Sequence, residues 1–194
     1  MKKLRIGVLG SGKGSNFQAI VEAMEAKGLA VDVRLVLSDV PGAGILRFAR
    51  EKGFVARELP PSRFKTRLDA EVEALLSVWL QEAGVELVVL AGYMRMVKEP
   101  LLAAFPGRIV NIHPSLLPQF PGLAAWRQAL DAKVSVTGCT VHWVDAGMDT
   151  GPIIAQREVP VLEGDTPETL HARIQVAEHA LYPEVLERLA ATLA

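Results

Sequence analysis

An amide, an imidazole and a carboxylate occupy two short segments in the second half of the chain. Asn111 and His113 lie in Asn111-Ile112-His113-Pro114-Ser115, and Asp149 begins the later segment Asp149-Thr150-Gly151-Pro152. Residues two apart in a strand point to the same side, so Asn111 and His113 face one site if the strand extends that far. A carboxylate from a later loop would orient the imidazole and raise its pKa. The three groups suit a reaction in which an oxyanion forms and a proton moves.

Each of these residues also has an ordinary structural explanation. A lone histidine is more often a buried core residue, and Asn111 could simply form a turn. Asp145 and Asp149 share one glycine-containing loop, where aspartates commonly cap turns, so we expect one to cap the loop and the other to face the site. We expect His142, on the preceding strand, to be structural or a secondary polar contact. The amide two residues before His113 and the proline-rich loop after it favour the functional interpretation.

A glycine-rich segment, Gly10-Ser11-Gly12-Lys13-Gly14-Ser15-Asn16, lies between the first predicted strand and the first predicted helix. Free N–H groups at a helix start attract an anion, and glycines let the backbone approach a phosphate closely. A tight turn without a ligand is the alternative. The segment fails the Walker pattern at Gly14 and the dinucleotide fingerprint at Ser15. Asp39 could still imitate a ribose-binding acid, so a nicotinamide oxidoreductase stays an alternative.

Apolar runs of strand length alternate with stretches of helical period along the first 91 residues. This alternation predicts an α/β fold with a doubly wound, mostly parallel sheet and helices on both faces. The last two predicted strands could form a hairpin-like pair. The predicted strands cover 4–9, 31–37, 54–59, 85–91, 108–112, 134–144 and 152–161, and the predicted helices cover 16–27, 45–52, 66–83, 123–131 and 166 to about 193.

Composition and charge exclude several classes of function. The chain has 194 residues, 50% of them hydrophobic, which suffices for one core and requires no second domain. The net charge of −1 gives no basic excess to follow a nucleic-acid backbone, so no nucleic-acid partner is expected. The single cysteine, Cys139, cannot form an internal disulfide, and its apolar surroundings predict a buried thiol. Prolines interrupt the longest uncharged stretch, so no membrane span is predicted, and we expect a cytoplasmic protein.

Three sequence patterns typical of metal sites or serine hydrolases are missing. It holds no His-Glu-x-x-His or Cys-x-x-Cys spacing, so we predict no metal site. It holds no Gly-x-Ser-x-Gly elbow either, which disfavours a serine hydrolase.

Four segments, taken in order, resemble the phosphoribosylglycinamide formyltransferase family, the folate-dependent glycinamide ribonucleotide transformylases of purine synthesis. The resemblance extends over nearly the whole chain, and its most specific part is the Asn-x-His-Pro-Ser segment with the later aspartate. Related formyltransferases and a formyltetrahydrofolate hydrolase are longer and as a rule lack the Gly-Ser-Asn loop. The four segments are 11–16, 90–95, 111–118 and 149–154.

This resemblance implies a role for each matching residue. Gly14, Ser15 and Asn16 would hold the phosphate of the ribonucleotide, and Glu178 would contact its ribose end. Asn111, His113 and Asp149 would be catalytic. Lys65 falls near a basic folate contact of the family, within a residue or two. Residues lining the pterin slot would be Met94, Arg95, Met96 and Val97, together with Asn111. The family often has histidines after the Pro-Gly-Leu of the proline-rich loop, and the segment 122–126 has none.

The resemblance also implies a reaction and a division of the chain. The formyl group of 10-formyltetrahydrofolate, a co-substrate, would pass to the amine of 5'-phosphoribosylglycinamide, with no metal. Residues 1–194 would form a single formyltransferase domain, in which 1–91 are the phosphate-binding half and 92–194 the folate and catalytic half. The partners would be small molecules, and the protein a monomer or homodimer. Hydrolysis of 10-formyltetrahydrofolate and a non-catalytic nucleotide sensor stay alternatives.

Overall fold

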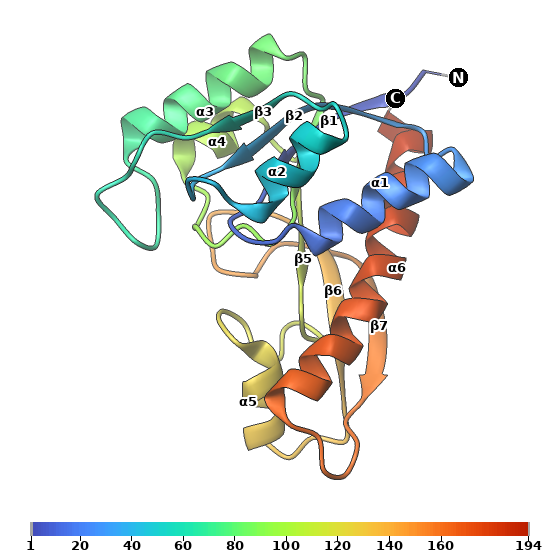
Figure 1. The fold of residues 1–194 in the computed structure, drawn as a ribbon. Helices are drawn as coiled ribbons and strands as arrows, with labels where there is room; N and C mark the ends of the chain where they lie inside the picture. Colours follow the sequence, from blue (N-terminus) through green and yellow to red (C-terminus); the bar gives the residue numbers. More distant parts are fainter. Residues whose placement is uncertain (1, 194) are drawn as a thin grey trace.

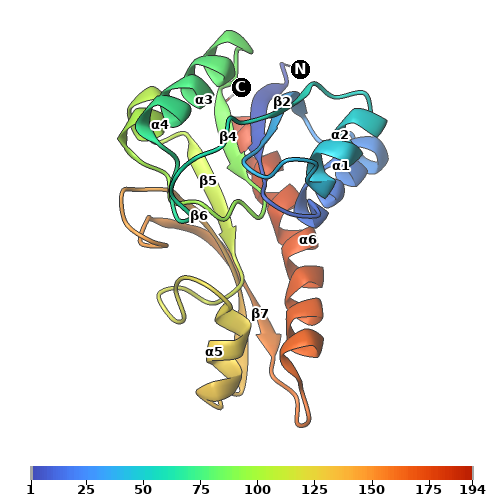
Figure 2. The ribbon, with the colours of Figure 1, turned by 60° about the vertical axis from the view of Figure 1, so that its left-hand side comes forward.

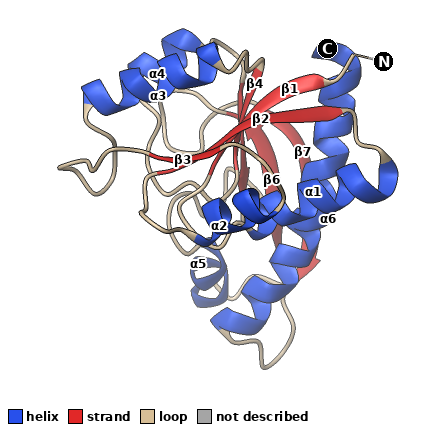
Figure 3. Cartoon of the chain, turned by 45° about the horizontal axis from the view of Figure 1, so that its top comes forward, coloured by secondary structure: helices blue, strands red, loops and turns tan. Residues whose placement is uncertain are grey.

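The structure is a computed structural model that describes residues 2–193. It contains one seven-stranded sheet in the order β3-β2-β1-β4-β5-β6-β7 (Figure 1 and Figure 3). The first five strands are parallel, and β6 and β7 are antiparallel to their neighbours. This confirms the predicted α/β class with a mostly parallel sheet. The strands are β1 (Leu4–Leu9), β2 (Val31–Ser38), β3 (Ala56–Glu58), β4 (Leu87–Leu90), β5 (Ile109–His113), β6 (Val136–Trp143) and β7 (Ile153–Pro160).

Helices cover both faces of the sheet. One apolar cluster contains residues of the helices α1, α2, α5 and α6. A second cluster on the opposite face contains residues of α3 and α4 (Figure 2). The central strand β4 is buried at every position because it separates the two clusters. The helices are α1 (Ser15–Lys27), α2 (Gly44–Glu51), α3 (Ala70–Glu82), α4 (Glu99–Ala104), α5 (Ala125–Asp131) and α6 (Pro167–Leu193). None of the helices among residues 2–193 is long and apolar enough to cross a membrane.

One helix prediction was wrong in its start, and one helix was not predicted. The helix predicted from residue 66 begins only at Ala70, because the carboxylate of Asp69 binds back into the preceding loop. It accepts hydrogen bonds from the Ser62 hydroxyl at 2.9 Å and from the Arg63 backbone N–H at 2.8 Å. The short helix α4 was not predicted, since six residues are too few to show a helical period.

The last turn before α1 requires glycine at position 14. Gly14 has φ of 79°, and a Cβ there would lie 2.7 Å from Ile45 Cβ and 2.9 Å from Ile45 Cα. We expect Gly14→Ala to lower the free energy of unfolding by at least about 2 kcal/mol, from left-handed strain plus this overlap. Urea unfolding followed by circular dichroism measures it.

Gly12 supplies the matched control for that experiment. A Cβ at Gly12 meets nothing within 4 Å, and the residue does not lie in the left-handed region. We therefore expect Gly12→Ala to change the free energy of unfolding by less than about 0.5 kcal/mol. Equal losses in the two variants would contradict the steric argument for Gly14.

Candidate active site

The strand β5 presents Asn111 and His113 at its carboxyl end. Within the sheet, Asn111 pairs with Leu90 of β4 and with His142 of β6, and His113 pairs with Thr140 of β6. Directly opposed residues of antiparallel strands project to the same face, so the side chains of Asn111 and His142 are neighbours. The amide Nδ2 of Asn111 lies 3.2 Å from Nε2 of His142.

Asp149 joins these side chains from the loop between β6 and β7. Its Oδ2 lies 3.4 Å from His113 Nδ1, and its Oδ1 lies 3.7 Å from His142 Nε2. Asp149 has φ of 56°, a left-handed conformation that aspartate tolerates better than most residues. Asp145 instead caps the loop, accepting bonds from Gly147 N and the Thr150 hydroxyl. The structure thus divides the two aspartates as the sequence predicted and brings residues 111, 113 and 149 together.

The proline-rich loop after β5 holds His113 and Asp149 in place. The ring nitrogen Nε2 of His113 donates to the Phe120 carbonyl at 2.9 Å, since a carbonyl can only accept. The N–H of Gly122 donates to Asp149 Oδ2 at 2.8 Å. Phe120 and Ala124 both have positive φ, of 54° and 53°. Such strain in non-glycine residues persists only where the surroundings enforce it, and here it borders the candidate site.

Burial, more than charge, sets the protonation of His113. The residue is only 5% exposed, and burial lowers the pKa of its imidazole below the usual value. The Phe120 carbonyl and the charge of Asp149 raise that pKa, but by less. The net direction is therefore opposite to the one predicted from Asp149 alone. Burial also raises the pKa of Asp149, but hydrogen bonding to the carboxylate, in which the Gly122 N–H is a donor, outweighs it, so the pKa of this carboxyl stays below its usual range.

The glycine-rich loop ends at the N-terminus of α1, whose first backbone N–H groups are not capped by a side chain. Gly14 is the N-cap of α1, and no side chain caps the first N–H groups of this helix. These groups have no partner within the helix and can bind an anion. Ser15 is the first helical residue, and Asn16, the second, is buried. The helix start without a side-chain cap therefore lies where Gly14, Ser15 and Asn16 were predicted to bind phosphate, and phosphate binding there stays a prediction.

Asn16 and Glu178 form a buried polar pair beside this helix start. Asn16 Nδ2 donates to Glu178 Oε2 at 3.0 Å, whereas Asn16 Oδ1 is buried without a hydrogen-bond partner. One turn further along α6, the hydroxyl of Tyr182 donates to the carbonyls of Leu90 and Val110 at 3.0 and 3.2 Å. Through α6, the helix start is therefore linked to the strand position just before Asn111.

The pair predicts an unusual pH dependence of stability. Burial raises the pKa of Glu178 from 4.5 to about 7, against the opposing effect of the Asn16 bond. Because the folded state then binds the proton more tightly, stability falls as pH rises from about 4.5 to about 7, by roughly 3 kcal/mol from this group. We expect Glu178→Gln to abolish this contribution, measured as the difference between wild-type and variant unfolding free energies across that range. Glu187 is exposed on the same helix, so Glu187→Gln is the control. If the unfolding free energy of this control differs from the wild type with the same dependence on pH, the assignment to Glu178 is refuted.

The predicted pterin-lining segment lies beside the loop that contains Lys65. Met96 N donates to the Thr66 carbonyl at 2.8 Å, and residue 67 pairs with residue 96 as an isolated parallel bridge. Met94 is exposed, Arg95 and Met96 are partly buried, and Val97 is buried. Lys65 is exposed, and Arg67, whose backbone pairs with Met96, places its guanidinium over the Phe64 ring at 4.3 Å.

The side chain of Arg95 is already engaged. Its Nε donates to Asp39 Oδ2 at 2.6 Å, and its Nη1 also donates to the Phe64 carbonyl. Asp39 Oδ1 accepts from the Ser11 hydroxyl at 2.6 Å. Both oxygens of Asp39 are therefore bonded within the protein, which weakens the idea that it binds a nicotinamide ribose.

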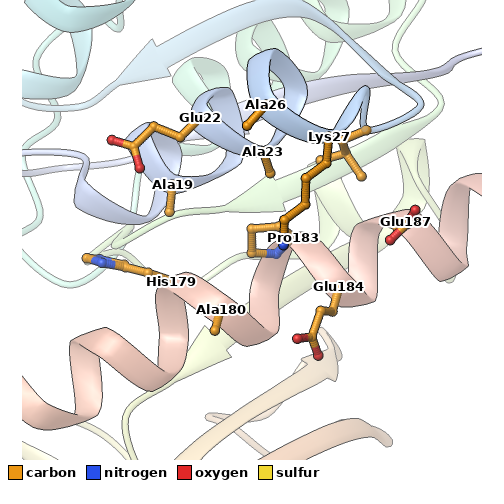
Figure 4. Close-up of a pocket in the computed structure, with 11 residues that line it drawn as sticks. Ala19, Glu22, Ala23, Ala26, Lys27, His179, Ala180, Pro183, Glu184 and Glu187 are labelled. Carbon is orange, nitrogen blue, oxygen red and sulfur yellow. The ribbon is translucent and has the colours of Figure 1, made fainter.

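A hollow elsewhere on the molecule does not coincide with this site. It has a volume of about 260 Å³ and lies between α1 and α6, with Ala19 and Ala23 on one side and His179 and Pro183 on the other (Figure 4). None of the residues 111, 113 or 149 lines it. Among residues 2–193, no cluster of three or more His, Cys, Asp or Glu side chains is arranged to hold a metal ion.

The profile of the formyl transferase family matches residues 4–186. The phosphoribosylglycinamide formyltransferase of Bacillus subtilis is 43% identical over 189 residues, which cover 97% of this chain and 95% of that protein. This chain belongs to the formyl transferase family. Its sheet and the Asn111–His113–Asp149 cluster are thus parts of a formyl transferase domain.

Two further comparisons show how this formyl transferase relates to longer and to solved proteins. The trifunctional purine biosynthetic protein adenosine-3 of Drosophila pseudoobscura is 45% identical over 188 residues, which cover 96% of this chain but only 14% of that protein. A crystal structure of glycinamide ribonucleotide transformylase 1 from Symbiobacterium toebii superimposes with a TM-score of 0.93 at 51% identity. That match covers 98% of this chain and 89% of the other.

Sequence reasoning underestimated one residue of this site. His142 is 2% exposed and lies between Asn111 and Asp149, where it was expected to be structural or secondary. Its proximity to Asn111 depends on the register of β5 against β6. A one-residue shift would have turned it to the other face, and the sequence alone does not fix that register.

Proposed function

We propose that this formyl transferase moves the formyl group of 10-formyltetrahydrofolate to the amine of 5'-phosphoribosylglycinamide, a step of purine synthesis. The observation that supports it most is the convergence of Asn111, His113 and Asp149, with His113 Nδ1 only 3.4 Å from Asp149 Oδ2. The free start of α1, linked to the same strand through α6, supplies the anion site that a ribonucleotide needs. In this proposal residues 1–91 hold the phosphate, and residues 92–194 hold the folate and the catalytic groups.

The proposed chemistry uses the two side chains of β5 as donors. Attack of the amine on the formyl carbon places negative charge on the formyl oxygen, which Asn111 Nδ2 and His113 Nε2 stabilise by hydrogen bonds. His113 Nε2 must first leave the Phe120 carbonyl, to which it is bonded at 2.9 Å. Asp149 holds the opposite side of the ring and orders the water that moves a proton from the amine to the leaving nitrogen. Holding both substrates together supplies a further part of the rate by alignment.

Ser15 lets the phosphate site be tested separately from the folate site. We expect Ser15→Asp to weaken ribonucleotide binding about 5- to 1,000-fold, since a carboxylate near the phosphate adds roughly 1–4 kcal/mol of repulsion. Ser15→Asn has the same size without the charge and is the control. Calorimetry with each ligand alone should show folate binding unchanged in both variants. Equal affinity of the Asp and Asn variants for the ribonucleotide would contradict the proposed phosphate contact.

Residues 94–97 are proposed to bind the pterin through backbone groups of Met94, Met96 and Val97. The side chain of Arg95 holds this segment in place through its hydrogen bond to Asp39. Lys65 is the proposed basic contact to the folate, and Arg67 competes for this role because its backbone pairs with Met96. Separate Lys65→Ala and Arg67→Ala variants decide between them. Alanine at the residue that contacts folate should raise KM for the formyl donor and leave KM for the ribonucleotide unchanged.

Hydrolysis of the formyl donor is the alternative that the same cluster could perform. The free helix start and the orphan Oδ1 of Asn16 argue against it, because a hydrolase needs no site for a ribonucleotide. A spectrophotometric assay of 10-formyltetrahydrofolate, with and without 5'-phosphoribosylglycinamide, distinguishes the two. Transfer requires loss of the formyl group that depends on the acceptor, whereas equal loss without the acceptor would mean hydrolysis.

A further inference from the structure

We propose that His142 is a positioning residue that fixes the orientation of the Asn111 side-chain amide. It does so as one neutral tautomer, protonated at Nδ1 and accepting at Nε2. The inference rests on the proposed function, because it concerns the group that would stabilise the formyl oxygen. Three distances around this almost completely buried ring support the assignment.

The first distance locates a proton on the ring. His142 Nδ1 lies 2.8 Å from the carbonyl oxygen of Trp143. A carbonyl oxygen can only accept, so Nδ1 must donate and therefore carries hydrogen. The side chain is 3% exposed, so solvent offers no substitute partner that would release this constraint.

The second and third distances decide the state of Nε2. It lies 3.2 Å from Asn111 Nδ2, within hydrogen-bond range, and 3.7 Å from Asp149 Oδ1, which is outside that range. An amide nitrogen can only donate, so its partner Nε2 must accept and carries no hydrogen. The ring is then neutral, and the nearer contact satisfies both groups.

This tautomer of His142 and the donor orientation of the Asn111 amide stabilise each other. One N–H of Nδ2 donates to His142, and the second N–H remains free for the formyl oxygen. Rotating the amide by half a turn would bring Oδ1 against the unprotonated Nε2, two acceptors with no hydrogen between them. That arrangement leaves buried polar atoms unpaired, which is unfavourable, so the donor orientation is the one that persists.

The charged and titratable groups around the ring allow this state. Asp149, from the β6–β7 loop, and His113, from β5, are the titratable side chains closest to His142. The Gly122 N–H, at 2.8 Å, and the His113 ring, at 3.4 Å, both contact Oδ2 of Asp149, whereas Oδ1 lies 3.7 Å from His142 Nε2, beyond hydrogen-bond range. The contact of Nε2 with Asn111, at 3.2 Å, is the shorter of its two polar contacts, so Nε2 is assigned as the acceptor from Asn111.

Two isosteric substitutions separate positioning from packing. His142→Asn keeps a polar amide group near the Nδ1 position and removes the acceptor near Nε2. His142→Gln can place its amide oxygen near Nε2. We expect His142→Asn to lower kcat about 3- to 10-fold, the value of one net hydrogen bond, with KM for both substrates within about twofold. His142→Gln should recover most of that loss. His171→Asn, a partly buried histidine on α6 outside the site, controls for loss of a histidine as such.

A measurement without turnover tests the tautomer directly. In ¹⁵N-labelled protein without substrates, long-range ¹H–¹⁵N spectra distinguish a protonated from an unprotonated ring nitrogen. The proposal requires a protonated Nδ1 and an unprotonated Nε2 in His142. A protonated Nε2, or equal kcat in the wild type and the Asn variant, would overturn it.

Failure of this inference can be told apart from failure of the proposed function. If the wild type transfers no formyl group, the function is wrong, although the spectra can still show the Nδ1 tautomer. If the wild type is active but neither the spectra nor the Asn variant behave as expected, only the role of His142 is wrong. Circular dichroism and thermal unfolding of each variant confirm that the kinetics report on folded protein.

Discussion

Replacing His113 with alanine is expected to lower kcat by about 10² to 10⁴, the range for a positioned acid–base group. The imidazole lies at the end of β5, and its two nitrogens contact the Phe120 carbonyl at 2.9 Å and Asp149 at 3.4 Å. Its removal takes away the donor from Nε2 and leaves Asp149 without its ring partner. Steady-state kinetics with both substrates saturating measure the effect, and near wild-type kcat would refute the assignment.

Chemical rescue separates the catalytic role of His113 from its structural role. The alanine variant leaves space for a free imidazole, which should restore part of kcat if the ring acts chemically. A merely structural loss would not respond, because a diffusing imidazole cannot restore the bond between the loop and the strand. The rescue should be absent in the Asn111 variants described next, whose imidazole is intact.

Replacing Asn111 with leucine, which has nearly the same shape, is expected to lower kcat by about 10² to 10³. This is the usual effect of removing one donor to an oxyanion. Because the interaction strengthens only as charge develops on the formyl oxygen, kcat and kcat/KM should fall by similar factors. Asn111→Asp is the second variant, since it keeps the size and places negative charge where the oxyanion forms.

The result that contradicts this role is a kinetic effect confined to KM. Asn111 would then bind the ground state and not the transition state. Thermal unfolding must accompany these kinetics, since leucine leaves Nε2 of His142 without its donor at 3.2 Å. Asn111 and His113 are proposed to act on one oxygen, so the double variant should lose less than the product of the two single effects.

Local patterns were enough to predict that Asn111, His113 and Asp149 lie close together. Asn111 and His113 are separated by one residue in an apolar strand, so alternation alone places them on one side. Asp145 and Asp149 could be expected to differ in role, because one aspartate caps a glycine-containing loop and the other can then face the site. The fold class followed from the alternation of apolar runs with helical periods, and the structure confirms it.

Features that depend on tertiary contacts could not be predicted. The start of α3 at Ala70 depends on bonds from Asp69 to Ser62 and Arg63, and local helical period says nothing about them. The importance of His142 depends on strand register. The pKa of His113 was predicted in the wrong direction, because the charge of Asp149 is visible in the sequence but the burial of the ring is not.

The fate of a labelled formyl group tests the central claim most directly. The protein is given 10-formyltetrahydrofolate with ¹³C in the formyl group, together with 5'-phosphoribosylglycinamide, and the carbon is followed by NMR. We predict that the label appears as a formamide on the ribonucleotide, at a rate that collapses in His113→Ala and in Asn111→Leu. Label released as free formate, or transfer at an undiminished rate in both variants, would contradict the account.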